Sequence, residues 1–297
     1  MTPGNHAQAL ALAASTFRIP AHIVMSTIST PSKIAGTKSY GANVIHSGST
    51  SDEREAVVAD VIEKTGAILV PPYDHPDIML GQGTLALELE TQAEEILAEE
   101  KSVIGRRQDG KSLDAVVAPC GGGGMLSGVA TALSGTGIKV FGAEPSFEGG
   151  DDARRGLLQG KRITKVKTLT IADGLRTPLG EIPWSVLSDK EKLHSMYAVT
   201  EEQIKKAMRL LLERAKIFVE PSAAVPLAVV LYNEDFRRLV ESEGGDKGWN
   251  IGVVLSGGNT TVDAIAKLYA PEAEKSGERA EGKVGAQGER VAENVAG

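Results

Sequence analysis

The chain has 297 residues, of which 41% are hydrophobic and 24% are charged, and its net charge at pH 7 is -7. These values are those of an ordinary packed protein, so they exclude wholesale disorder and a fibrous repeat, and the excess of acid disfavours a nucleic-acid partner. There is no apolar run long enough for a membrane span, no secretory leader, and only one cysteine. We therefore expect a cytoplasmic protein without a membrane partner.

Short runs rich in Val and Ile alternate along the chain with amphipathic stretches. This alternation predicts an α/β fold, in which parallel sheets are flanked by helices. The expected strands are 21–25, 43–46, 67–70, 114–118, 139–143 and 251–255. Acidic residues after Ser51 predict a helix that runs to Lys64, and the capping-box spacing from Thr200 to Gln203 predicts the start of another.

Two stretches depart from this alternation. Residues 94–112 are dense in charge, which predicts a helix end followed by a solvated loop. Residues 271–297 consist mainly of small and charged residues with almost no bulky apolar side chain. We expect them to form a disordered tail.

The strand expected at 114–118 leads into a glycine-rich turn that precedes a helix-like stretch. The turn consists of Gly121, Gly122, Gly123 and Gly124, followed by Met125. Without Cβ atoms the backbone can approach a phosphate closely, and its N–H groups together with the helix dipole compensate the negative charge. The alternative is a merely tight turn, which we disfavour because four glycines cost conformational entropy without a return in packing.

A dinucleotide is a rival ligand for this turn. Glu144 ends the next strand, about 20 residues after the glycines, where dinucleotide-binding folds keep a ribose-binding acid. The glycine spacing does not fit, because Leu126 and Ser127 occupy the sixth positions counted from Gly121 and Gly122. A phosphate loop of the nucleotide-hydrolase type fails as well, because no Gly-Lys-Ser or Gly-Lys-Thr follows.

A second glycine-bearing turn, 256–259, follows the strand expected at 251–255. Because both turns end strands of a parallel sheet, one ligand could touch both. The Ser256 hydroxyl can pair with a neutral ring nitrogen or serve as a helix N-cap. Asn5, ahead of an Ala-rich helix, can likewise cap that helix or donate to a ligand oxygen.

Seven short segments carry a resemblance when they are taken together: 4–10, 81–84, 121–125, 143–145, 171–174, 220–223 and 255–259. In this order they resemble the serine/threonine dehydratase and serine racemase family, which are pyridoxal-phosphate (PLP) enzymes of the two-domain tryptophan-synthase-beta fold, fold type II. The resemblance covers residues 4–268. It implies a small mobile domain at 1–74 that closes on the substrate carboxylate, a large cofactor-binding domain at 75–270, and a homodimer.

The resemblance also implies roles for individual residues. The turn formed by Gly121, Gly122, Gly123, Gly124 and Met125 would hold the cofactor phosphate. Asn5 would bond the ring hydroxyl, Ser256 would face the pyridine nitrogen, and Glu220 would lie near the ring. The implied substrate is a small hydroxy amino acid, whose α-proton is removed before either hydroxide leaves the β-carbon or the proton returns on the other face.

The chain departs from the family in lacking its Schiff-base lysine. In the family that lysine lies in a segment before the Gly4-Asn5-His6 turn, which this chain does not contain. Lys33 and Lys38 correspond to positions where lysines are ordinary surface residues. We therefore expect weak cofactor binding and little turnover, which leaves a catalytically impaired pseudoenzyme or a truncated form as an alternative.

Pro3 is a second departure. Racemases of the family place a serine before the Gly-Asn-His turn to protonate the opposite face, and Pro3 cannot donate a proton. Unless Thr2 substitutes, we expect β-elimination to a keto acid and ammonia. Serine racemase remains the alternative activity.

A divalent-ion site is a further implication. Many relatives bind such an ion through an acid before a proline, a backbone oxygen and a later aspartate, and oxygen ligands suit Mg²⁺ or Ca²⁺. The corresponding set here is Glu144, the backbone oxygen of Gly150, and Asp152, with a gap about two residues longer than in those relatives. A solvated acidic loop is the alternative.

Overall fold

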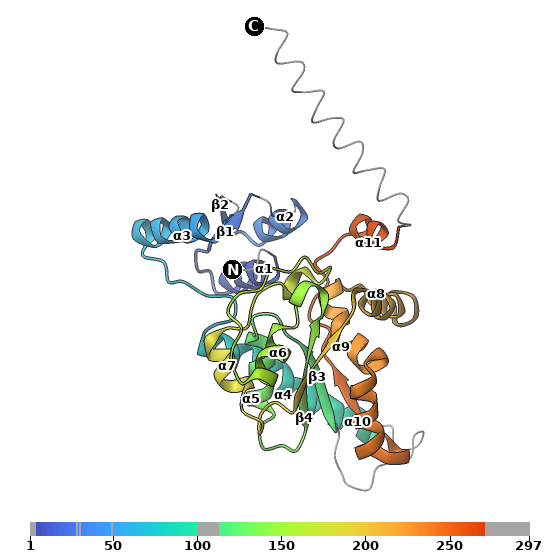
Figure 1. Cartoon of the computed structure of the whole chain (residues 1–297). Coiled ribbons are helices and arrows are strands. Elements are labelled where there is room, and N and C mark those ends of the chain that lie inside the picture. The colour runs from blue at the N-terminus through green and yellow to red at the C-terminus, as the bar shows by residue number, and fades with distance from the viewer. Residues whose placement is uncertain (1–3, 28, 30, 49, 100–112, 271–297) are drawn as a thin grey trace. The chain divides into compact units, whose positions relative to one another are not determined.

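The computed structural model describes residues 4–27, 29, 31–48, 50–99 and 113–270 (Figure 1). The chain divides into two compact units, residues 1–259 and 260–297. Thr2, Pro3, the greater part of the expected loop and the expected tail lie outside the described residues. In chain order the elements are α1 (Asn5–Thr16), β1 (His22–Ser26), α2 (Pro31–Ser39), β2 (Asn43–Ser47), α3 (Ser51–Thr65), α4 (Pro76–Glu99), β3 (Ala115–Pro119), α5 (Gly124–Ala132), β4 (Lys139–Pro145), η1 (Phe147–Gly149), α6 (Asp152–Gln159), η2 (Asp173–Leu175), α7 (Glu181–Leu187), β5 (Ser195–Val199), α8 (Glu201–Leu210), η3 (Leu211–Ala215), α9 (Pro221–Tyr232), α10 (Glu234–Gly244), η4 (Gly245–Lys247), β6 (Ile251–Val253) and α11 (Val262–Tyr269).

The first unit contains a four-stranded parallel sheet in the order β5-β4-β3-β6. In Figure 1, α4 and α5 lie on one side of this sheet and α9 on the other. All five residues of β3 are buried, because β3 is paired on both edges and covered on both faces. The predicted α/β class with parallel sheets and flanking helices is confirmed.

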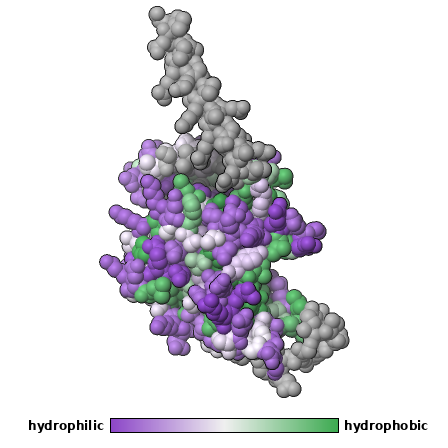
Figure 2. Space-filling view, turned by 45° about the vertical axis from the view of Figure 1, so that its right-hand side comes forward, coloured by the Kyte–Doolittle hydropathy of each residue, from purple (hydrophilic) through white to green (hydrophobic). Residues whose placement is uncertain are grey.

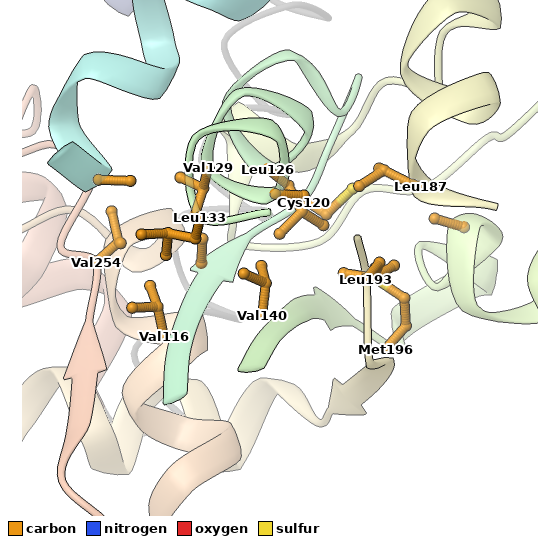
Figure 3. Packing of buried hydrophobic residues seen from close by; sticks show 14 of the residues in the cluster. Val116, Cys120, Leu126, Val129, Leu133, Val140, Leu187, Leu193, Met196 and Val254 are labelled. Atoms are coloured by element: carbon orange, nitrogen blue, oxygen red, sulfur yellow. The ribbon is translucent and has the colours of Figure 1, made fainter. Parts of the chain in front are cut away.

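The core of this part lies between α5 and the sheet. Figure 3 shows Leu126, Val129 and Leu133 against Val116 of β3 and Val140 of β4. Full burial of a side chain of this size contributes about 1.5–3 kcal/mol to the stability of the fold. This core supports the glycine turn, which joins β3 to α5.

A two-stranded parallel sheet, β1-β2, lies nearer the N-terminus, with register from His22 opposite Asn43 to Ser26 opposite Ser47. Ala7 of α1 forms a small buried cluster with Ile23 and Met25 of β1. The strand expected at 67–70 was wrong, because these residues have no regular secondary structure and no strand of the described chain pairs with them.

Capping explains where two of the helices begin. The Thr50 side chain accepts from the Glu53 backbone N–H, and the Glu53 carboxylate accepts from the Thr50 N–H, which closes a capping box on α3. Thr200 and Gln203 form the same box on α8. Both predicted helix starts are confirmed.

Within the described residues, no helix combines the length and the apolar character that crossing a bilayer requires. Figure 2 shows hydrophilic and hydrophobic residues interspersed over the face in view. This mixed pattern is that of an ordinary protein surface, to which apolar atoms also contribute.

Candidate functional site

A cavity of about 460 Å³ lies where β3 and β6 end and α1 begins. Its lining includes every residue that the sequence suggested for cofactor binding: Asn5, Gly121, Gly122, Gly123, Gly124, Met125 and Ser256. Glu220, at the N-terminal end of α9, lines it too. Residues more than 200 positions apart in sequence thus meet at the edge of the parallel sheet where ligands bind in this architecture.

The glycine turn is fixed by its neighbours as well as open to the cavity. A Cβ on Gly122 would lie 2.4 Å from the Tyr73 ring, and a Cβ on Gly123, whose φ is +86°, would lie 2.3 Å from Leu179 Cδ1. The expectation that these glycines bring no return in packing was therefore wrong. Close approach of Tyr73 and Leu179 requires glycine here, independently of any ligand.

The turn nevertheless fits a phosphate. Gly123 is the N-cap of α5 and has no side chain to satisfy the first backbone N–H groups of the helix. Gly121, Gly122, Gly123 and Gly124 all face the cavity, so these N–H groups and the positive end of the helix dipole can meet an anion there.

Tyr73 was not identified from the sequence. Its ring packs on Gly122 and its backbone and Cβ lie against Gly124. Tyr73 lines the cavity, and burial and the Asp74 charge raise the pKa of its phenol. Asp74 fixes the segment by accepting from the backbone N–H groups of Glu181 and Ile182, at 3.0 and 2.9 Å. No sequence pattern marks Tyr73, because the turn that it packs on, which holds Gly122 and Gly124, is distant in sequence.

A hydrogen-bond network links the start of α1 to the far wall of the cavity. Asn5 Nδ2 donates to Glu220 Oε1 at 2.6 Å, and Asn259 Nδ2 donates to Asn5 Oδ1 at 2.6 Å. Asn5 does not cap α1, whose N-cap is Gly4. Burial raises the pKa of Glu220 and the nearby Asp173 carboxylate adds to the rise, whereas Asn5 and Lys33 oppose it.

Lys33 lies at the edge of this network. Its side chain is 13% exposed and its ammonium forms an ion pair with Asp173. A Cβ on Gly4 would lie 2.8 Å from Lys33 Cδ, which explains why glycine, with a φ of +141°, occupies position 4. The interpretation of Lys33 as an ordinary surface residue was wrong, whereas Lys38 is exposed as expected. No lysine is among the described residues that line the cavity.

The acids suggested for a metal ion are Glu144, near the end of β4, and Asp152, at the start of α6. Glu144 is fully buried, and its two carboxylate oxygens accept from the backbone N–H groups of Ala153 and Arg154 at 3.0 and 2.9 Å. Asp152 Oδ2 accepts from Leu179 N at 3.0 Å. Since Glu144 and Asp152 are both buried, a solvated acidic loop does not describe these two residues.

Burial disfavours the charged forms of Glu144 and Asp152. Burial raises the pKa of Glu144 well above its usual range, and the Asp152 carboxylate raises it further. Burial also raises the pKa of Asp152 to about 6. Two buried acids fit a hard cation, but no cluster of three or more His, Cys, Asp or Glu side chains in the described residues is placed to hold one. A bound ion would therefore need a backbone oxygen, such as that of Gly150.

The chain is similar in sequence and structure to several known proteins. The chain is 40% identical over 264 residues to a serine racemase of Arabidopsis thaliana, which covers 88% of this chain and 72% of that one. It is 37% identical over 270 residues to the L-threo-3-hydroxyaspartate ammonia-lyase of Saccharomyces cerevisiae, with 90% and 74% covered. The solved structure of maize serine racemase matches with a TM-score of 0.77 at 35% identity, over 94% of this chain and 77% of that one.

The family comparison covers most of the chain. Residues 1–257 match the family described as pyridoxal-phosphate dependent enzyme. Its cofactor accounts for the phosphate-binding turn, and the fold of its members accounts for the parallel sheets. The chain therefore belongs to the pyridoxal-phosphate dependent enzymes, with the tryptophan-synthase-beta-like fold of that family.

Proposed function

We propose that this site carries out PLP-dependent elimination on small hydroxy amino acids, as a serine/threonine ammonia-lyase. The observation that carries the proposal is the meeting of the glycine turn, Ser256 and the Asn5–Glu220 pair in one cavity. An ammonia-lyase that acts on L-threo-3-hydroxyaspartate is among the relatives, at 37% identity.

Each residue has a part in this chemistry. PLP, when bound, withdraws electrons from the α-carbon of an amino acid, which acidifies its α-proton. The N–H groups of residues 121–125 would bind the phosphate, the Ser256 hydroxyl would pair with a neutral ring nitrogen, and Asn5 would donate to the ring oxygen. Glu220, whose pKa is raised, can hold a proton beside the ring at a higher pH than an exposed glutamate.

Pro3 supports elimination over racemisation. Racemisation requires a donor that returns the proton to the opposite face, and proline has none to give. Thr2 carries a hydroxyl close to this position in sequence and would be the catalytic donor if racemisation occurred. Serine racemase is the second candidate, favoured by the 40% identity to the Arabidopsis thaliana enzyme.

Four further features belong to the proposal. Glu144, Asp152 and the Gly150 carbonyl would hold Mg²⁺ or Ca²⁺, whose charge offsets the two buried carboxylates. Residues 1–74 would close over the substrate as a mobile domain against 75–270. The homodimer and the cytoplasmic location stay predictions.

The test begins with the cofactor. Purified chain is titrated with PLP and followed by visible absorption, then reduced with borohydride and mapped for a modified lysine. We expect weak binding without a mapped lysine, because no described lysine lines the cavity. Stoichiometric trapping on one lysine would contradict this expectation and would identify a lysine of this chain that reaches the cofactor.

Activity is measured with L-serine, L-threonine and L-threo-3-hydroxyaspartate, by keto-acid release and by chiral separation of the remaining amino acid. A small primary amine such as methylamine is added because no lysine of the described residues lines the cavity. We expect keto acid to exceed D-serine and to rise with the amine. Dominant D-serine would support the racemase, and PLP binding without any amine-dependent product would identify an impaired form.

A further inference from the structure

The η2 turn forms part of the wall of the cofactor cavity, and the chain that leads into it is irregular. Residues 162–170 form neither helix nor strand, so no ladder of backbone hydrogen bonds holds this stretch. Gly174 and Leu175 of η2 nevertheless line the cavity. The turn therefore depends on contacts with neighbouring elements for its position.

The η2 turn lies directly against the glycine turn that would bind the cofactor phosphate. A Cβ on Gly121 would lie 3.0 Å from Leu175 Cα and 3.1 Å from the Gly174 carbonyl oxygen. On another side, the Gly174 N–H donates to the Ser222 hydroxyl of α9 at 3.0 Å. Because the two turns are in such close contact, a displacement of η2 would also displace the glycine turn.

Glu201, the first residue of α8, holds the chain just before η2. Its Oε1 accepts from the Thr170 hydroxyl at 2.6 Å, and its Oε2 accepts from the Ile171 backbone N–H at 2.8 Å. Hydrogen bonds to a carboxylate are roughly twice as strong as those between neutral groups. The two oxygens of one carboxylate thus bind two consecutive residues at the entrance to the turn.

Thr170 is fully buried and its polar groups are paired. Its hydroxyl accepts from the Ala172 N–H at 3.2 Å, and its own N–H donates to the Thr168 hydroxyl at 3.2 Å. Arg176 Nη2 donates to its carbonyl oxygen at 2.6 Å. Removal of the Glu201 carboxylate would leave the buried Thr170 hydroxyl without its acceptor, which favours a rearrangement of this segment.

The helix that carries Glu201 is itself fixed in the core. The capping box of Thr200 and Gln203 sets where α8 begins, one residue before Glu201. Three side chains of α8 are fully buried: Ile204, Ala207 and Met208. The position of the Glu201 carboxylate is therefore determined by the packed core, and this carboxylate transmits that position to the irregular segment.

We propose that Glu201 is a positioning residue, which holds η2 against the glycine turn and so keeps the phosphate-binding N–H groups in place before the cofactor arrives. Glu201 does not line the cavity, so it acts through Thr170 and Ile171. A site that is formed in advance loses less conformational entropy on binding and therefore binds more tightly. This role rests on the proposed function for the identity of the cofactor, whereas the contacts of Glu201 lie within the chain.

The experiment compares Glu201→Ala with Glu202→Ala. Both variants remove a carboxylate from the first turn of α8, so both lose the same interaction with the helix dipole. The Glu202 side chain is 72% exposed and pairs with Lys205 on the same helix. Thr170→Val is a further variant, which removes the hydroxyl that Glu201 accepts from while it keeps the shape of the side chain.

Hydrogen–deuterium exchange is measured first, without cofactor. The reporters are residues 170–175 and 121–127, and β3 is the internal reference. We expect exchange at least tenfold faster in both reporter segments of Glu201→Ala and unchanged exchange in Glu202→Ala. β3 should exchange equally in all the proteins, because its ladder does not depend on Glu201.

Affinity is measured next, by equilibrium dialysis with PLP and with pyridoxal, which lacks the phosphate. We expect Glu201→Ala to bind PLP at least fivefold more weakly and pyridoxal less than twofold more weakly, because the displaced N–H groups face the phosphate. Glu202→Ala should bind both as the unsubstituted chain does. A general loss of structure would weaken both ligands equally, so the ratio of the two affinities separates positioning from a merely structural role.

Unchanged exchange at residues 121–127 in a folded Glu201→Ala protein would overturn the proposal. Equal losses of PLP and pyridoxal affinity would overturn it as well. If Glu201→Ala does not fold, the same two measurements on Thr170→Val decide. Faster exchange in both reporter segments of a chain that binds no PLP would contradict the proposed function and leave the positioning role of Glu201 in place.

Discussion

The four-stranded and the two-stranded sheet have similar apolar sequences but different surroundings. β3 has a strand on each side and is buried along its whole length, whereas among the described residues β1 pairs with β2 alone. Residues 67–70 are as apolar as β3, yet they form no strand and expose Ile68. The difference teaches that an apolar run becomes a strand only where a partner satisfies its backbone.

Truncation of a core side chain tests the comparison most directly. Leu126 is fully buried between α5 and the sheet, so Leu126→Ala leaves a cavity and we expect a loss of about 2–5 kcal/mol in the free energy of unfolding. Ile68→Ala in the exposed segment should change it by less than about 0.5 kcal/mol. Urea denaturation measures both, and equal losses would show that Ile68 is buried in solution.

The buried acid Asp152 makes the stability of the fold depend on pH. The pKa of Asp152 is about 6 in the folded chain, against 3.8 for an ordinary aspartate, so the folded state binds the proton more tightly. Its contribution to stability is therefore greatest below pH 4 and falls as the pH rises to about 6, by about 3 kcal/mol.

Asp152→Asn should reduce the slope to the part that the buried Glu144 contributes, and Asp77→Asn, at an exposed side chain, should leave the slope in place. Thermal unfolding from pH 4 to pH 7 measures it in metal-free buffer. Added Mg²⁺ should stabilise the unsubstituted chain at pH 7 and have no effect on Asp152→Asn. Equal Mg²⁺ responses in the two proteins would remove the proposed ion from this site.

Two glycine substitutions distinguish the effect of a steric clash from the effect of backbone strain alone. Gly123→Ala must adopt a positive φ and place a Cβ against Leu179, so we expect a loss of about 2 kcal/mol and at least tenfold weaker PLP binding. Gly160→Ala has the same sign of φ but nothing within 4 Å of its Cβ. It should lose about 1 kcal/mol and keep its PLP affinity, which a PLP titration checks. Equal PLP affinities in the two variants would contradict the cradle.

The Lys33–Asp173 ion pair joins α2, which packs beside the two-stranded sheet, to η2 at the cofactor cavity. Lys33→Met should cost about 1 kcal/mol and raise the pKa of Glu220, because the Lys33 charge holds that pKa down. Lys64→Met, which breaks an exposed pair with Asp60, should cost less than about 0.5 kcal/mol. The pH profile of PLP binding reports the Glu220 shift, and an unshifted profile would place Lys33 outside the site.

Local patterns predicted a good part of the fold and of the site. The capping boxes at Thr50 and Thr200 depend on residues three apart, and so they were legible in the sequence. The strands β3 and β4 and the glycine turn between β3 and α5 were found for the same reason. β5 (Ser195–Val199) was missed because its apolar side chains do not alternate cleanly, and only pairing with β4 makes it a strand.

The sequence by itself determined the α/β alternation, the two glycine-bearing turns and the family, because each rests on neighbouring residues or on motif order. Only the tertiary structure decided that Tyr73 packs on the glycine turn, that Lys33 pairs with Asp173, and that residues 67–70 stay irregular. These outcomes depend on partners far away in the chain. Contacts of that kind are set by which surfaces the packed core brings together, and no local pattern records them.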